Sequence, residues 1–412
     1  MNFTKPRKIA AKLIVYKNLR KDAILGRFFE AVTEQQLYEV LSLLVEASEK
    51  YGLSGDIFRQ YVLRLLLIDE NIFSLACERG EINLNLSLYK MALNDVKLVM
   101  ELMEFAMEDV LEYQEILPYL SNFVCSEPYI EMCQNAATPR ELLEIIMKSN
   151  KLNGSGVLFK NVMFTYAEGL VPAKKPAFAC FDEIIGCERQ KRILYDNVKA
   201  FINGKPAANM LLVGPKGTGK SSCVKALINE FGSDGLCVVA VSREQFVELP
   251  ALLHELSRRG KKFIVLFDDL SFDLALENAE AGYKNLKSIL EGGVEDTPKN
   301  VLFCATSNRR ALVKEEWGDK RGTVAEDGEI HVSDAVNEKQ SLRDRFGLVV
   351  SFAKPTPLEF YEIVNRLLIK EGFNISEDVI KRRANEWELG QSGLSGRAAR
   401  NLAMIIMRNE YK

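Results

Sequence analysis

Apolar residues recur every three or four positions through the first 150 residues, which is the spacing of amphipathic helices. Thr33 and Gln36 form a capping box directly ahead of one apolar stripe, which begins at Leu37. Ser54 stands at the equivalent place before the next stripe, and we expect it to cap that helix. No pattern repeats with a fixed period here, so the prediction is an all-helical N-terminal domain over residues 1–150 rather than a solenoid.

From about residue 178 the pattern alternates between short apolar runs and helical stretches, as in a parallel sheet flanked by helices. Five runs have the length and composition of buried strands: Met210–Val213, Leu236–Val241, Phe263–Phe267, Val301–Ala305 and Leu348–Phe352. We therefore expect an α/β core with five parallel strands over 178–353, followed by a helical lid over 354–412. A linker that contains one short strand, Leu158–Tyr166, is expected over 151–177.

A glycine-rich turn, Gly-Pro-Lys-Gly-Thr-Gly-Lys-Ser-Ser, connects the first strand-like run to a helical stretch. This is the pattern and the context of a P-loop, in which backbone N–H groups and the start of the next helix surround a phosphate. Lys220 is expected to reach the β- and γ-phosphates of a nucleotide, and the Ser221 hydroxyl to face Mg²⁺. An ordinary strand-to-helix turn is the alternative. The residues predicted to bind the nucleotide are Gly214, Pro215, Lys216, Gly217, Thr218, Gly219, Lys220, Ser221 and Ser222.

Two further strand-like runs end in polar side chains that fit the same chemistry. Phe263–Phe267 is followed by Asp268 and Asp269, the form of a Walker B element. We expect Asp268 to hold Mg²⁺ together with Ser221, and Asp269 to orient the attacking water. The next run ends at Asn308, whose amide can contact that water or the γ-phosphate. Taken singly, each of these groups could also be the polar start of a surface turn.

The order of these motifs, with Ser341-Leu-Arg-Asp-Arg-Phe-Gly347 and Ser395-Gly-Arg397 behind them, resembles the AAA+ ATPases from about Phe181 to Lys412. More narrowly, the chain is similar to an uncharacterised bacterial family of predicted AAA+ ATPases with a helical N-terminal region. Over residues 1–150 the resemblance is vague. The narrower likeness is carried by the P-loop and by Phe267-Asp-Asp-Leu-Ser-Phe272, Leu286-Lys-Ser-Ile-Leu-Glu-Gly-Gly293, Ala305-Thr-Ser-Asn-Arg-Arg310, Asp344-Arg-Phe-Gly-Leu348 and Ser395-Gly-Arg397.

The resemblance implies a fold, an α/β P-loop NTPase core with a C-terminal helical lid, and roles for individual residues. Arg345 is implied to be an arginine finger that acts on the nucleotide of a neighbouring subunit, and Arg343 lies close enough to be the alternative. Arg397 is implied to be the sensor 2 residue of the lid, and Ile185 to flank the adenine. The second Walker B acid of the family is usually Glu. Asp269 is one methylene shorter, so we expect an altered turnover rate rather than altered binding.

Charge and cysteine usage narrow the class of protein further. The 412 residues carry a formal net charge of -3, which does not favour a general nucleic-acid binder. The eight cysteines include no Cys-x-x-Cys pair and there are only two histidines, so we do not expect a zinc site. No apolar run has the length of a membrane span or the form of a secretory leader, and we expect a cytoplasmic protein.

Together these observations predict an AAA+ ATPase that binds ATP and Mg²⁺ and hydrolyses ATP to remodel or regulate a macromolecule, either a protein or a nucleic acid. A homo-oligomer, of which a ring is one form, is expected because Arg345 is implied to act across a subunit boundary. The alternative is a nucleotide-gated switch or scaffold that binds ATP and hydrolyses little of it. The short side chain of Asp269 motivates that alternative.

Overall fold

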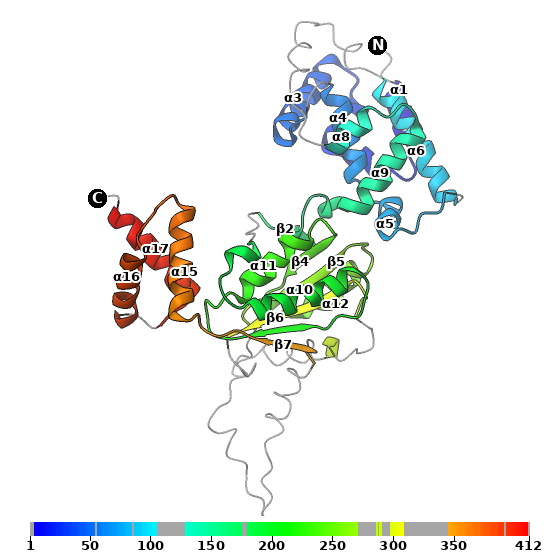
Figure 1. Cartoon of the computed structure of the whole chain (residues 1–412). Helices are drawn as coiled ribbons and strands as arrows, with labels where there is room; N and C mark the ends of the chain where they lie inside the picture. Colours follow the sequence, from blue (N-terminus) through cyan, green and yellow to red (C-terminus); the bar gives the residue numbers. More distant parts are fainter. Residues whose placement is uncertain are drawn as a thin grey trace, which may run out of the picture. The chain divides into compact units, whose positions relative to one another are not determined.

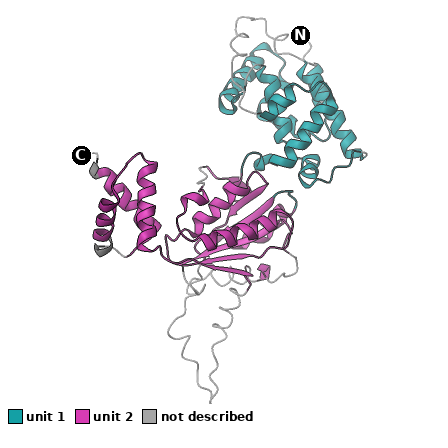
Figure 2. Cartoon of the chain, in the orientation of Figure 1, with its two compact units in different colours: residues 1–161, 258–261 teal, residues 162–257, 262–412 magenta. Residues whose placement is uncertain are grey.

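The computed structural model describes residues 4–53, 56–84, 86–104, 128–174, 179–270, 286, 288–290, 297–308, 345–390 and 393–410. The chain divides into two compact units, which are coloured separately in Figure 2. Unit 1 comprises residues 1–161 and 258–261, and unit 2 comprises residues 162–257 and 262–412. Each unit has a hydrophobic core of its own.

Unit 1 is built from helices, as the apolar stripes predict (Figure 1). The capping box of Thr33 and Gln36 is present at the start of α3. The cap of α4 is Asp56, which accepts a hydrogen bond from the N–H of Arg59, so the prediction of Ser54 as the cap is wrong; Ser54 lies outside the described residues. The elements are α1 (Thr4–Lys12), η1 (Lys17–Lys21), α2 (Ala23–Glu30), α3 (Glu34–Tyr51), α4 (Ile57–Ile68), α5 (Ile72–Arg79), α6 (Ser87–Met103), α8 (Pro128–Gln134), α9 (Pro139–Asn153) and η3 (Gly156–Leu158).

A buried carboxylate on α6 holds the turn that follows α1. Asp95 is fully buried, and its Oδ2 atom accepts hydrogen bonds from the backbone N–H groups of Ile14, Val15 and Tyr16, at 2.8, 2.7 and 3.0 Å. A turn offers these N–H groups no helical partner, and a buried N–H without a partner is costly. Asp95 therefore allows the backbone of this turn to be buried without leaving its N–H groups unpaired.

A second buried carboxylate ties the segment 258–261 into unit 1. Glu78 accepts hydrogen bonds from the N–H and the hydroxyl of Ser155, at 2.7 and 2.6 Å, and lies 3.3 Å from Nε of Arg259. The buried Arg259 guanidinium also pairs with Glu70 at 2.8 Å and donates to the Ser155 carbonyl at 2.7 Å. Two buried charges of opposite sign depend on each other, because removing one leaves the other uncompensated.

The end of the helical unit differs from the predicted linker. Helix α9 continues to Asn153, and Ser155 is fully buried in unit 1, so the first residues of the predicted 151–177 linker are part of the helical unit. The limit at residue 150 thus lies within a helix, because the Gly154 that ends α9 comes four residues later. The other predicted domain limits remain predictions.

The described part of unit 2 contains a seven-stranded sheet with the order β2-β1-β4-β5-β6-β3-β7. The five predicted strands are present and parallel, but the prediction of a five-stranded sheet is wrong, because two further strands join it. The short strand predicted in the linker joins the sheet as β1, and β2 pairs antiparallel with it. The strands are β1 (Met163–Tyr166), β2 (Leu170–Pro172), β3 (Met210–Val213), β4 (Leu236–Ala240), β5 (Lys262–Phe267), β6 (Val301–Ser307) and β7 (Leu348–Ser351).

The strand order brings the predicted site together. Strand β3 lies between β6 and β7, and β6 lies beside β5. Val213 pairs with Ser307, and Phe267 pairs with Ala305, so these three strands end at one edge of the sheet. Ligands of open α/β sheets bind outside the carboxyl ends of the strands, and this is the edge from which the P-loop emerges.

Alternating residues of the strands face two different helical layers. Met210 and Leu212 pack in one core with α10 and α11. On the other face, the ring of Phe267 lies 5.2 Å from that of Phe246 in η5 and 5.8 Å from that of Phe303. The elements of these layers are η4 (Phe181–Glu183), α10 (Glu188–Ile202), α11 (Lys220–Phe231), η5 (Arg243–Glu248) and α12 (Leu249–Ser257).

The C-terminal helices of unit 2 form a small bundle with its own core, drawn in orange to red in Figure 1. Phe360, Val364 and Leu402 are among the buried residues of this core. None of the helices in the described ranges has the length and apolarity needed to cross a membrane. The bundle helices are α15 (Pro357–Lys370), α16 (Glu377–Gly390) and α17 (Gly396–Glu410).

Candidate functional site

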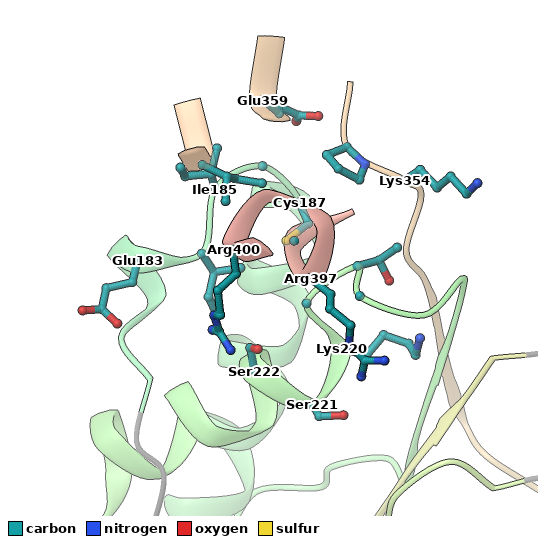
Figure 3. Close-up of a pocket in the computed structure, with 18 of the residues that line it drawn as sticks. Glu183, Ile185, Cys187, Lys220, Ser221, Ser222, Lys354, Glu359, Arg397 and Arg400 are labelled. Carbon is teal, nitrogen blue, oxygen red and sulfur yellow. The ribbon is translucent and has the colours of Figure 1, made fainter. Parts of the chain in front are cut away.

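A cavity of about 1030 Å³ opens at the edge of the sheet where β3, β5 and β6 end, and it is lined by both the α/β core and the C-terminal helices (Figure 3). Most of the residues predicted from the sequence line it. Gly214, Pro215 and Arg345 do not. The predicted residues that line the cavity are Ile185, Lys216, Gly217, Thr218, Gly219, Lys220, Ser221, Ser222, Asp268, Asp269, Asn308 and Arg397.

The P-loop lysine is nearly buried and is held by its own loop. The Lys220 ammonium donates to the carbonyls of Gly214 and Pro215, at 2.7 and 2.8 Å. It also donates to Oδ1 of Asn308 at 3.1 Å. Burial lowers the pKa of Lys220, and the carboxylates that follow β5 oppose this shift. A cation in such a poorly hydrated place interacts strongly with an anion that enters beside it.

The start of α11 offers donors to an anion. Gly219 precedes this helix with φ 92°, a left-handed conformation that favours glycine. The first N–H with a helical partner is that of Cys223, which donates to the Gly219 carbonyl at 2.8 Å. Among the described residues, the N–H groups of Lys220, Ser221 and Ser222 have no hydrogen-bond partner. Free N–H groups at the positive end of a helix fit a phosphate.

Two hydroxyls and a carboxylate meet at the predicted metal position. Ser221 donates to Oδ1 of Asp268 at 2.8 Å, and the Thr306 hydroxyl donates to the same oxygen at 2.6 Å. Carboxylate and hydroxyl oxygens are hard donors of the kind Mg²⁺ prefers, and this ion usually keeps several of its waters. Ser221 and Asp268 therefore fit Mg²⁺, while Thr306 fixes the carboxylate from the sheet.

Asp269 and Asn308 are joined directly. The Asn308 amide donates to Oδ1 of Asp269. The N–H of Asp269 donates to Thr306 Oγ1 at 2.9 Å, and its carbonyl accepts from Arg243 at 2.7 Å. These contacts hold Asp269 at φ 56°, a left-handed conformation that Asp tolerates better than most residues. Because Asn308 also accepts from Lys220, one amide connects the P-loop lysine to the candidate water-orienting acid.

The lid meets the P-loop at the start of α17. The N–H of Gly396 donates to the carbonyl of Gly217 at 2.8 Å. A Cβ atom at Gly217 would lie 3.1 Å from the side chain of Ser395, so the approach is close. Arg397 follows directly, and Arg400 comes one turn later; both line the cavity.

The stretch predicted to flank the adenine is fastened to α15. Lys370 pairs with Glu183 at 2.6 Å, and Arg366 donates to the carbonyl of Asp182 at 2.7 Å. The hydrogen bond between Lys370 and Glu183 lowers the pKa of the carboxyl and raises the pKa of the ammonium. Both side chains are exposed, so the pair adds little stability and acts mainly to place Ile185 beside the lid.

Arg345 lies away from the cavity of its own chain. It precedes β7 by three residues, and Leu348, the first residue of β7, pairs with Met210 at the amino end of β3. The P-loop follows the opposite, carboxyl end of β3. Any contact of Arg345 with a nucleotide would therefore have to be made in another subunit. Arg343, the alternative finger, lies outside the described residues.

Among the cavity residues that were not predicted from the sequence, Thr306 and Arg400 lie close to predicted ones. Thr306 lies near the end of β6, and Asn308 lies two positions later, just past the end of this strand; each bonds to one of the two acids that follow β5. Arg400 lies three positions after Arg397, which places both on one side of a helix. In each case the spacing was available as a signal, but it needed the register of the element to be known.

The parallel strand order, the P-loop after β3, the paired acids after β5 and the helical bundle beside them define the fold of an AAA+ P-loop ATPase. The chain belongs to the family described as "Protein of unknown function (DUF815)", which matches residues 159–409. The predicted membership of an uncharacterised AAA+ family is therefore confirmed for this part of the chain. Residues 1–158 lie outside the match.

More distant similarity covers about half of the chain. The replication factor C large subunit of Nanoarchaeum equitans (strain Kin4-M) is 24% identical over 233 residues, which are 55% of this chain and 45% of that protein. The chain thus spans less than half the length of this relative. Among solved structures, the K64R mutant of Thermotoga maritima RuvB has 18% identity and a TM-score of 0.39, over 55% of this chain and 63% of its own. PCH-2 of C. elegans has 18% identity and a TM-score of 0.38, over 55% of this chain and 64% of its own.

Proposed function

We propose that this protein binds ATP with Mg²⁺ in the cavity and hydrolyses it, and that hydrolysis remodels or regulates a macromolecular partner. The observation that carries the proposal is the meeting of Lys220, the Ser221–Asp268 pair and the Asn308–Asp269 pair in one cavity. Transfer of a phosphoryl group to water needs a phosphate cradle, a metal anchor and a group that orients the water. A described side chain is available for each of these tasks.

The chemistry divides among these residues. Lys220 would exchange its loop carbonyls for the β- and γ-phosphates, and the free N–H groups of α11 would bind beside it. Mg²⁺, held by Ser221 and Asp268, would supply positive charge to the phosphate oxygens. The Asp269 carboxylate, positioned by Asn308, would orient the attacking water and accept its proton.

The remaining roles extend beyond one chain. Arg397 would sense the γ-phosphate from the lid, and Ile185 would flank the adenine. Arg345 would add positive charge to the transition state in a neighbouring copy, which makes the active form a homo-oligomer, for instance a ring. We place the protein in the cytoplasm and assign recognition of the partner, a protein or a nucleic acid, to unit 1, which is a compact helical unit separate from the one that holds the cavity.

Phosphate release by the purified chain, with ATP and Mg²⁺, tests the proposal. The Lys220→Ala variant should lose ATP binding and turnover together, because the phosphates lose their main cation. Lys225→Ala is the matched control, since Lys225 lies on the same helix and does not line the cavity. Equal turnover in wild type and Lys220→Ala would overturn the assignment of the site.

A second candidate function, a switch that binds ATP and hydrolyses it slowly, is favoured by the environment of Asp269. Its carboxylate is one methylene shorter than Glu, accepts from Asn308 and lies 3.9 Å from the Lys216 ammonium. Protein groups thus compete with water for it. Under the switch hypothesis, Asp269→Glu raises turnover in a single-turnover experiment. Rapid phosphate release by the wild type alone would exclude the switch.

A further inference from the structure

Helix α17 presents two arginines to the cavity, and the proposed function uses only the first. Arg397 and Arg400 are three residues apart, so they share one side of the helix and are separated by about 4.5 Å along its axis. Both side chains are exposed and line the cavity. Within the part of the chain that the structure describes, neither guanidinium has a hydrogen bond or an ion pair.

The cations of the neighbouring lid helix behave differently. On α15, Arg366 pairs with Glu362 at 2.7 Å and donates to a backbone carbonyl, and Lys370 pairs with Glu183 at 2.6 Å. Both of these residues line the same cavity. The two cations of α15 are therefore engaged by protein groups, whereas the two arginines of α17 keep their full set of donors for a ligand.

The two arginines are directed to different parts of the P-loop. Figure 3 shows the guanidinium of Arg397 on the side of Lys220 and that of Arg400 on the side of Ser222. Lys220 marks the β- and γ-phosphates of a bound nucleotide. The N–H of Ser222 is the last free donor of α11, because the next N–H, that of Cys223, already has a helical partner. With Lys220 at the β- and γ-phosphates, that donor would face the α-phosphate, which the backbone N–H groups of a P-loop also contact.

We propose that Arg400 binds the α-phosphate of the nucleotide, so that the lid is held by ADP as well as by ATP. This inference rests on the proposed function, because it assumes a nucleotide in the cavity. The γ-phosphate distinguishes ATP from ADP, and Arg397 senses it. The α-phosphate is common to both, so Arg400 keeps the lid in contact with the product after the γ-phosphate has left. Arg400 thereby sets the rate of ADP release and of nucleotide exchange.

The two arginines should therefore have different signatures in binding. Loss of Arg400 weakens the binding of ATP and the binding of ADP by the same factor, roughly tenfold, because a charge-assisted hydrogen bond to the shared phosphate is removed. ADP dissociates faster by about the same factor. Loss of Arg397 weakens the binding of ATP more than the binding of ADP, and so lowers the ratio of ATP affinity to ADP affinity.

The experiment is displacement of a fluorescent ADP analogue from the full-length chain by unlabelled ATP and ADP, with dissociation of the analogue followed by stopped flow. The variants are Arg400→Ala, Arg400→Lys and Arg397→Ala. Arg408→Ala is the matched control, because Arg408 is an exposed arginine on the same helix that does not line the cavity. The lysine variant keeps the charge and loses the planar fork, so it should recover only part of the affinity.

Equal weakening of ATP and ADP in Arg400→Ala, with faster release of the ADP analogue and no change in Arg408→Ala, supports the inference. Weakening of ATP alone would place Arg400 at the γ-phosphate and overturn it, and so would unchanged binding of both nucleotides. If the wild type binds neither nucleotide, the proposed function itself fails. The wild-type measurement separates that failure from a failure of the Arg400 assignment.

Discussion

The two units of this chain use polar side chains in opposite ways. In unit 1, Asp95, Glu78 and Arg259 are buried, and each makes several contacts with backbone or charged groups of the same unit. In unit 2, Arg397 and Arg400 are exposed to a cavity and, among the described residues, have no protein partner. A buried charge held by several partners stabilises one conformation, whereas an unpaired charge in a cavity is available to a ligand. In the C-terminal bundle, the arginines without a partner among the described residues are thus the ones that a ligand can recruit.

The largest expected effect concerns Arg345. The Arg345→Ala variant should bind ATP as the wild type does and turn over about a thousandfold more slowly, because an arginine finger acts on the transition state rather than on ground-state binding. Steady-state phosphate release and nucleotide affinity, measured side by side, give both values. Arg343→Ala is the matched control, and a steep loss in that variant instead would move the finger by two residues.

Mixing two inactive variants tests whether the finger acts between subunits. Arg345→Ala subunits retain Asp269, and Asp269→Asn subunits retain Arg345, so a mixed oligomer contains some complete sites. Partial recovery of turnover on mixing is expected. No recovery in a preparation shown to contain mixed oligomers contradicts action across a subunit boundary.

The buried ion pair of unit 1 should give the next largest effect, on stability alone. Glu78→Ala removes the buried acceptor of Ser155 and leaves the buried Arg259 cation paired with the exposed Glu70 instead of a buried carboxylate, which should cost about 3–5 kcal/mol of the free energy of unfolding of unit 1. Hydrogen exchange of the α5 and α9 amides in the full-length chain measures it. The matched control is Arg140→Ala, which breaks the exposed pair with Glu144 and should cost less than about 0.5 kcal/mol. Similar losses in the two variants would contradict the contrast between buried and exposed charges.

A smaller difference between the two units is expected in the rates at which their cysteines are alkylated. Burial raises the pKa of Cys77 and of Cys133 in unit 1 to about 12, so these thiols should resist alkylation at pH 7 while the chain is folded. In unit 2, a hydrogen bond from Cys223 and the charge of Lys191 lower the pKa of Cys187, which lines the cavity. Its thiolate is thus more populated at neutral pH, and Cys187 should label before Cys77 and Cys133.

ATP should slow the labelling of Cys187 by about tenfold, because the nucleotide covers the cavity in which this thiol lies. Mass spectrometry after short exposure to iodoacetamide measures the modification of each cysteine. As the pH rises from 6 to 9, the rate at Cys187 should level off earlier than that of an unperturbed thiol, since its pKa is lowered. Labelling of Cys77 before Cys187, or no protection by ATP, would contradict the assignment of the cavity.

Local patterns predicted which residues of the α/β core line the cavity, and long-range pairing determined the rest. Lys220, Asp268 and Asn308 follow buried strands, so the periodicity that predicts a strand also predicts the edge at which its polar end lies. The addition of β1 and β2 to the sheet depends on pairing between distant segments, which periodicity does not encode. The same holds for Arg259, whose partner Glu78 is far away in the sequence. A buried arginine therefore looks like an exposed one until the fold is known.

The most direct test of the central claim, that Asp269 activates water at a bound ATP, is the turnover of Asp269→Asn relative to its affinity for ATP. The amide keeps the size of the side chain and the contact with Asn308 but cannot accept a proton from water. We predict an unchanged ATP affinity and a turnover lowered by about a hundredfold or more. Unchanged turnover in Asp269→Asn, with wild-type affinity for ATP, would contradict the account.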